Sequence, residues 1–251
     1  MTYTEIHIWG DSLARGIIYN EASQRYAISR ERCATRLQAE LGCKIENHAN
    51  MGATVLDGLA LFERFTPVPG ALCAIEFGGN DCDLDWKTVS TQPTEPVQAK
   101  VALDVFAQGL TTFVERVRAR GMQPLLVTPL PLHAERYFRW VTRGLDADAV
   151  LQALGDVYHI YRWQERYANT VRAVARATHC RLLDLRDVFL AQPDYEKLMC
   201  MDGIHPNDAG HRVLSDAVLE TLRAEAATEG FAAAEAASAA YTAIPSAAKV
   251  S

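Results

Sequence analysis

The sequence predicts one α/β domain in which a mainly parallel sheet is covered on both faces by helices. Its 251 residues, 49% hydrophobic and 22% charged, have the size and composition of a single large globular domain. Short apolar segments alternate with helical patterns along the chain, and this alternation implies right-handed crossovers between parallel strands. Such sheets bind ligands beyond the carboxyl ends of their strands, so functional residues are expected at that edge.

Five short segments rich in apolar or β-branched residues are predicted to be buried strands. They run from Glu5 to Trp9, Lys44 to Ala49, Leu72 to Phe77, Pro124 to Thr128 and Arg181 to Leu185. Between the third and fourth lies the clearest helical pattern, an apolar stripe with 3,4,3,4 spacing that ends before Gly121. Its members are Leu103, Phe106, Leu110, Phe113 and Val117.

Two segments differ from this alternating pattern. From Tyr137 to Tyr167 there are seven aromatic residues in 31, which predicts either two helices that bury aromatic side chains or a lid or pocket wall. From Ala224 to Ser251, 13 of 28 residues are alanine, which predicts a frayed helix followed by disorder. The predicted organisation is therefore one domain over residues 1–223 and a flexible tail over 224–251.

Composition and charge exclude several classes of function. A net charge of −6 provides no basic field for nucleic acid. No uninterrupted apolar run approaches the roughly 18 residues of a membrane span, and Glu5 and His7 stand where a signal peptide would be apolar, so a cytoplasmic location is expected. The six cysteines lack CxxC or paired Cys/His spacing, which favours reduced, mostly buried thiols and predicts no metal or other cofactor.

Three polar blocks follow the first three predicted strands. Gly10-Asp11-Ser12-Leu13 places Ser12 at a strand's carboxyl end, either as a nucleophile or as an ordinary helix cap. Asn50-Met51-Gly52 and Gly78-Gly79-Asn80-Asp81 follow the next two strands. The backbone N–H of Gly52 and the amide of Asn80 are the donor types of an oxyanion hole, although both residues also suit tight turns.

A fourth block, Asp202-Gly203-Ile204-His205-Pro206, precedes an amphipathic helix near the end of the chain. The spacing of three lets Asp202 bind one imidazole nitrogen of His205, so that the other nitrogen accepts a serine proton. Taken alone, the pair is equally explained by a capping aspartate and a half-buried histidine. Together with Ser12, Gly52 and Asn80 it completes a nucleophile, oxyanion donors, a base and its orienting carboxylate.

In order and spacing, the four blocks resemble those of the SGNH hydrolases, also called the GDSL esterase/lipase family, over roughly residues 5–222. The resemblance implies a flavodoxin-like three-layer α/β/α sandwich with a five-stranded, mainly parallel sheet, and ester hydrolysis without metal or cofactor. It also implies Ser12 as nucleophile, His205 as general base and Asp202 as its partner. The oxyanion would be held by the N–H groups of Ser12 and Gly52 and by the side chain of Asn80.

The predicted function is hydrolysis of small-molecule carboxylic esters with short acyl groups, through an acyl-enzyme on Ser12. Carbohydrate O-deacetylation and lysophospholipase or thioesterase activity are alternatives, and the non-enzyme alternative is a binding module, favoured if Ser12 lay far from His205. His133, which follows the fourth predicted strand, is either structural or in contact with substrate. The loop containing Asp81, Asp83, Asp85 and Trp86 predicts an acidic pocket wall or a solvated loop. The sequence leaves the oligomeric state open.

Overall fold

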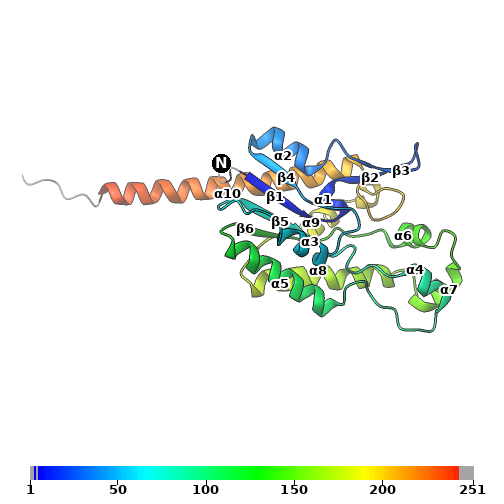
Figure 1. Ribbon diagram of the computed structural model, residues 1–251. Helices are drawn as coiled ribbons and strands as arrows, with labels where there is room; N and C mark the ends of the chain where they lie inside the picture. Colours follow the sequence, from blue (N-terminus) through cyan, green and yellow to red (C-terminus); the bar gives the residue numbers. More distant parts are fainter. Residues whose placement is uncertain (1–2, 4, 243–251) are drawn as a thin grey trace, which may run out of the picture.

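One five-stranded parallel sheet forms the centre of the molecule. The computed structural model describes residues 3 and 5–242, with side chains as far as residue 227 (Figure 1). The strand order is β4-β1-β5-β6-β7, and every neighbouring pair is parallel. Each predicted strand overlaps an observed one, so the predicted fold class is confirmed. The strands are β1 (Glu5–Gly10), β4 (Lys44–Asn47), β5 (Leu72–Glu76), β6 (Gln123–Val127) and β7 (Arg181–Leu183).

Helices cover both faces of the sheet, which gives the predicted three layers. One face is covered by α3 (Val55–Phe62), α5 (Leu103–Ala119) and α8 (His159–Ala177). The opposite face is covered by α2 (Cys33–Leu41), α9 (Leu185–Leu190) and α10 (Asp208–Thr242). Figure 1 shows α5 and α8 on one side of the sheet and α2 and α10 on the other.

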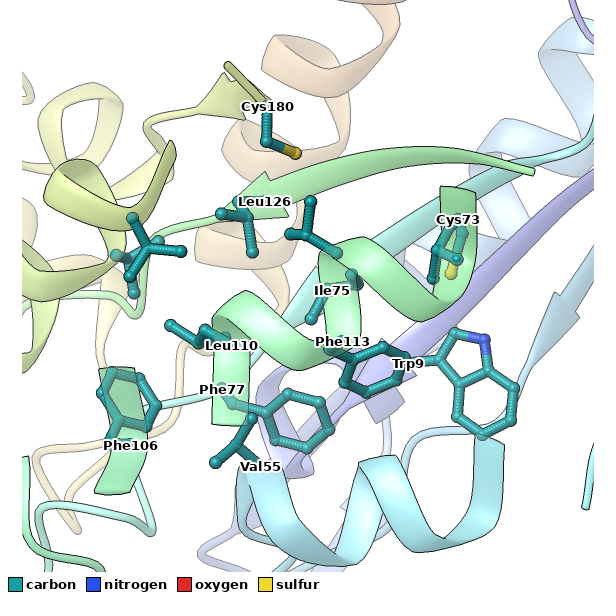
Figure 2. Close-up of a cluster of buried hydrophobic side chains, with 14 of the residues drawn as sticks. Trp9, Val55, Cys73, Ile75, Phe77, Phe106, Leu110, Phe113, Leu126 and Cys180 are labelled. Atoms are coloured by element: carbon teal, nitrogen blue, oxygen red, sulfur yellow. The ribbon is translucent and has the colours of Figure 1, made fainter. Parts of the chain in front are cut away.

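The larger core lies between the sheet and α5 (Figure 2). Alternate strand residues such as Trp9 and Ile75 face this helix, because side chains of a strand point to opposite faces in turn. Four members of the predicted stripe are fully buried, and each contributes about 1.5–3 kcal/mol by leaving water. They are Phe106, Leu110, Phe113 and Val117.

Shorter elements gather beyond the carboxyl ends of the strands. The antiparallel hairpin β2–β3 was not predicted, because every residue of its second strand is exposed and shows no apolar alternation. Helices α4, α6 and α7 surround a third, smaller apolar cluster. These elements are α1 (Ser12–Arg15), β2 (Ile17–Asn20), β3 (Arg25–Ile28), α4 (Trp86–Thr91), α6 (Ala134–Val141), α7 (Ala147–Leu154) and the 3-10 turn η1 (Tyr195–Leu198).

The aromatic segment forms three helical pieces rather than the predicted two: α6, α7 and the start of α8. It is partly core and partly pocket wall, since Tyr167 is buried in the main core whereas Tyr137 and Trp163 line a cavity. None of the six cysteines is in a disulfide, and five are buried, as expected.

Helix α10 continues to Thr242, into the predicted tail. Residues 243–251 lie outside the described residues, so the flexibility of the tail stays a prediction. Among the helices of the described residues, none is both long enough and apolar enough to cross a bilayer.

Candidate active site

Ser12 is the first residue of α1, directly beyond the end of β1. Asp11 caps this short helix, with Oδ1 accepting the N–H of Leu13 at 2.8 Å. A Cβ at Gly10 would lie 2.6 Å from the carbonyl oxygen of Glu76, so glycine permits the close approach of β1 to β5. The chain passes from β1 to β4 on one side and later to β5 on the other, and ligands of open α/β sheets bind at this switch point.

His205 and Asp202 reach Ser12 from the other end of the chain. His205 Nε2 lies 2.8 Å from Ser12 Oγ, and His205 Nδ1 lies 2.6 Å from Asp202 Oδ2. Asp202 Oδ1 also accepts the backbone N–H groups of Ile204 and His205, both at 3.1 Å. The Asp202 side chain is fully buried, but its negative charge is surrounded by donors. The structure thus brings together the three side chains that the sequence predicted as a nucleophile, a base and its orienting carboxylate.

The loop that carries Asp202 and His205 packs closely against the start of α6 at Gly203. Gly203 has φ of +76°, and a Cβ there would lie 2.6 Å from the backbone nitrogen of Tyr137. The N–H of His133 donates to Gly203 O at 2.8 Å. His133 caps α6 and is not among the residues that line the cavity, which favours the structural interpretation of this residue.

The β2–β3 hairpin covers the same loop from the other side. The ring of Tyr26 packs edge-on against the imidazole of His205, with 5.2 Å between centroids. Burial and the nearby Asp202 carboxylate raise the pKa of Tyr26 to about 12, so its phenol stays neutral. Sequence patterning missed this contact because it missed the hairpin.

The two predicted oxyanion donors occupy different settings. Asn80 lines a cavity together with Ser12 and His205, and its Nδ2 donates to Asp11 Oδ2 at 3.0 Å. Gly52 lies on an exposed turn with φ of +80° and does not line that cavity. The N–H of Asn50 donates to Gly10 O at 3.1 Å, which fastens this turn beside the end of β1. The oxyanion role of Gly52 stays a prediction.

Two buried carboxyl groups, those of Asp11 and Glu76, lie beneath the turn that carries Ser12. Neither carboxyl oxygen of Glu76 has a well-aligned hydrogen-bond donor, whereas Asp11 receives the N–H of Leu13 and the amide of Asn80. Burial raises the pKa of both groups, and the neighbouring Asp11 charge raises the pKa of Glu76 further. The pair therefore retains a proton, and the carboxyl that lacks donors, Glu76, is the one that holds it.

The cavity wall opposite Ser12 is mainly apolar and aromatic. Its side chains come from the loop after β5, the start of α4, the loop after β6 and the helices α6 and α8. A short, uncharged group can be buried against such a wall. The wall includes Leu84, Trp86, Leu132, Tyr137, Ile160 and Trp163.

Of the three aspartates in the predicted acidic wall, only Asp83 lines the cavity. Asp83 Oδ1 accepts Trp86 Nε1 at 2.8 Å and Tyr137 Oη at 2.7 Å, and Lys100 Nζ lies 2.8 Å from Asp83 Oδ2. Asp81 is not a solvated residue: it is fully buried and accepts the N–H groups of Val55 and of Gly78 in its own loop, and burial raises its pKa to about 7. Asp85 caps α4.

Within the described part of the chain, one group of three side chains has the spacing of metal ligands: His7, Glu46 and His48. None of them lines the cavity at Ser12.

Comparison with known proteins identifies a family and a fold. Residues 8–213 match the family model described as the GDSL-like Lipase/Acylhydrolase family. Among solved structures, a lipase/acylhydrolase from Enterococcus faecalis has a TM-score of 0.62 at 18% identity, covering 88% of this chain and 96% of that one. No curated protein sequence matches the chain.

Two structures described as esterases share the fold. A catalytic mutant of an acetylxylan esterase from Geobacillus stearothermophilus has a TM-score of 0.58 at 20% identity, covering 86% of this chain and 92% of that one. The psychrotrophic esterase EstA from Pseudoalteromonas has a TM-score of 0.55 at 17% identity, covering 88% of this chain and 97% of that one.

Proposed function

Because this chain belongs to the GDSL-like lipase/acylhydrolase family, we propose that it hydrolyses small carboxylic esters of short acyl groups through an acyl-enzyme on Ser12. The observation that carries the proposal is the continuous hydrogen-bonded series from Ser12 Oγ through His205 to Asp202. This contact also argues against a non-catalytic binding module, which would not require a serine 2.8 Å from an imidazole nitrogen.

Acylation begins when Ser12 Oγ attacks the ester carbonyl while His205 Nε2 takes the hydroxyl proton. Asp202 holds the Nδ1–H tautomer and stabilises the imidazolium that forms. The tetrahedral intermediate collapses when the bond to the alcohol oxygen breaks, and His205 returns the proton to the leaving alcohol. Deacylation repeats the sequence, with water as the nucleophile and Ser12 as the leaving group.

The developing oxyanion would be stabilised by the Ser12 N–H, the Gly52 N–H and the Asn80 amide. As the first residue of α1, Ser12 has a backbone N–H without an acceptor inside the helix. Asn80 donates to Asp11, which orients its amide while a second N–H of the same group remains for substrate.

The test is hydrolysis of p-nitrophenyl acetate, butyrate and octanoate by the wild type and by Ser12→Ala, with a chelator present. We expect chelator-resistant hydrolysis, fastest on the short esters, that falls by about 10⁴-fold or more in Ser12→Ala. The matched control is Ser23→Ala, which changes an exposed serine in the β2–β3 turn. Retained activity in Ser12→Ala would overturn the mechanism, and preference for octanoate would favour the lysophospholipase or thioesterase alternative.

Carbohydrate O-deacetylation is the second candidate, favoured by the aromatic cavity wall and by the structural likeness to an acetylxylan esterase. The rings of Trp86 and Trp163 suit the apolar face of a sugar as well as an acyl chain. Acetate release from acetylated xylo-oligosaccharides, measured against p-nitrophenyl acetate, distinguishes the two. A higher kcat/KM on the oligosaccharide would support the deacetylase, and equal or lower values would support the general esterase.

A further inference from the structure

We propose that His7, Glu46 and His48 form a binding site for one borderline divalent cation, with Zn²⁺ as the expected ion. The three residues lie on β1 and at the end of β4, on the α3 side of the sheet and apart from the Ser12 cavity. This inference is independent of the proposed esterase activity, because it concerns different residues.

The distances between the three candidate ligand atoms fit a tetrahedral ion. His7 Nδ1 lies 3.0 Å from His48 Nε2, and each of these nitrogens lies 3.7 Å from Glu46 Oε2. An ion with bonds of about 2.0–2.1 Å to its ligands separates them by roughly 3.3–3.5 Å. Small rotations of the two rings would therefore place all three atoms around one ion.

Two imidazoles and one carboxylate are ligand types that suit a borderline divalent cation. Lys44 contacts Glu46 Oε1, and this leaves Oε2 facing the two histidines.

An outer carboxylate supports the metal-binding tautomer of His7. Glu5 Oε1 lies 3.2 Å from His7 Nε2, although Nε2 has no well-aligned hydrogen-bond partner. With the proton of His7 on Nε2, facing Glu5, the Nδ1 lone pair is directed at the site, as in the carboxylate–histidine–metal arrangement of many zinc proteins. His7 itself is completely buried, and its Nδ1 is at hydrogen-bond distance from His48 Nε2.

Neighbouring groups favour a dication and hold the rings in place. The carboxylates of Glu5 and Glu46 and the ammonium of Lys44 give this group one net negative charge when both imidazoles are neutral. The ring of Trp9 stacks on His48 with 4.3 Å between centroids, and Phe65 packs against both imidazoles. The side chains of His48 and Glu46 are 23% and 36% exposed, so an ion and a coordinating water can enter from solvent.

Metal binding at this site would join β1 to the edge strand β4 at the base of the Gly52 turn. The N–H of His48 already donates to Ile8 O at 2.8 Å. An ion that binds only the folded chain stabilises it by mass action. When the free ion concentration is a hundred times Kd, binding raises the Tm of a chain of this size by about 5–10 °C.

The experiment uses the full chain without an affinity tag, stripped with a chelator and dialysed. We expect calorimetric titration with Zn²⁺ to give one equivalent of saturable binding and the Tm to rise as stated, whereas Mg²⁺ gives no shift. Co²⁺ is expected to give the visible absorption of a four-coordinate ion without a thiolate charge-transfer band.

The variants are His48→Gln and Glu46→Gln, which change half-buried ligands and spare the buried His7. Each is expected to remove the Zn²⁺-dependent rise in Tm, whereas the matched control His179→Asn, at an exposed histidine, retains it. The proposal is overturned if the wild type shows no saturable binding, if binding survives in both variants, or if a thiolate band assigns the ion to the cysteines.

Discussion

Two pairs of buried groups lie close to Ser12, Asp202–His205 and Asp11–Glu76. They differ in the hydrogen-bond donors that reach their carboxyl groups. In the loop at residues 202–206, the Asp202 carboxylate is surrounded by two backbone N–H groups and the His205 imidazole. Beneath the turn that carries Ser12, the Asp11–Glu76 pair has two carboxyls, and well-aligned hydrogen-bond donors reach only Asp11. The first region supplies donors to its buried carboxyl, whereas in the second burial and the neighbouring Asp11 charge raise the pKa of Glu76.

The difference shows that burial alone does not decide the ionisation of a carboxyl group. Asp202 and Glu76 are similarly inaccessible, yet their hydrogen-bond partners differ completely. A buried carboxylate needs donors that replace its lost hydration, and without them it takes up a proton instead. Substitutions that change donors or protons in each region therefore test the contrast directly.

The largest effect is expected from Asp202→Asn. An asparagine amide facing His205 Nδ1 would favour the wrong imidazole tautomer, with the proton on the nitrogen that must accept from Ser12. We expect kcat for p-nitrophenyl acetate to fall by about 10⁴-fold. A melting curve recorded on the same sample separates this loss from unfolding, and a decrease of less than tenfold in a folded variant would contradict the role of Asp202.

A smaller effect is expected from Asn80→Ala. Asn80 connects the Asp11–Glu76 pair to the reacting carbonyl, because it donates to Asp11 and lines the cavity beside Ser12. Removing one oxyanion donor should lower kcat by about 10²–10³-fold with little change in KM. Asn169→Ala, on the exposed side of α8, is the matched control. An effect below about tenfold would remove Asn80 from this role.

The smallest change in activity is expected from Glu76→Gln, and it should depend on pH. Glutamine retains an N–H donor toward Asp11, so kcat/KM at pH 6 should stay within about threefold of the wild type. The pKa of Glu76 lies well above 4.5 in the folded protein, so stability from its proton is complete below pH 4.5 and is lost as pH rises through the folded pKa. Deprotonation would also add a negative charge close to the oxyanion.

The measurements are pH profiles of kcat/KM and of Tm for the wild type, Glu76→Gln and the exposed control Glu115→Gln. As pH rises through the folded pKa of Glu76, Tm and kcat/KM should fall less in Glu76→Gln than in the other two proteins. Parallel alkaline profiles for all three would show that the pair does not hold a proton.

The sheet and the grouping of residues around Ser12 could be predicted from the sequence, because both depend on short local patterns and their order along the chain. Short apolar runs identify buried parallel strands, and the residues that follow them meet at one edge of the sheet. Ser12, Asn80, Asp202 and His205 could therefore be grouped before any distance was known, and the structure brings these four together. Gly52 lies on an exposed turn after β4, and its oxyanion role stays a prediction.

Other features depend on contacts that no local pattern contains. The interpretation of Asp81 as part of a solvated loop was wrong, because its carboxyl is buried and accepts the N–H of Val55 at the start of α3 and the N–H of Gly78 in its own loop. The group at His7 arises from the register that places His7 beside Glu46 across two strands, and its residues have no cysteine or histidine spacing to signal a metal. The raised pKa of Glu76 reflects its burial without well-aligned hydrogen-bond donors, and this setting depends on tertiary contacts that a sequence does not display.

The separation of Ser12 from His205 also has a consequence for biosynthesis. The two residues are 193 positions apart, with the serine near the start of the chain and the histidine after the last strand of the sheet. At a synthesis rate of about 5–20 residues per second, Ser12 is made roughly 10–40 s before its base. Under the proposed mechanism, Ser12 could act as a nucleophile only after most of the domain has been translated.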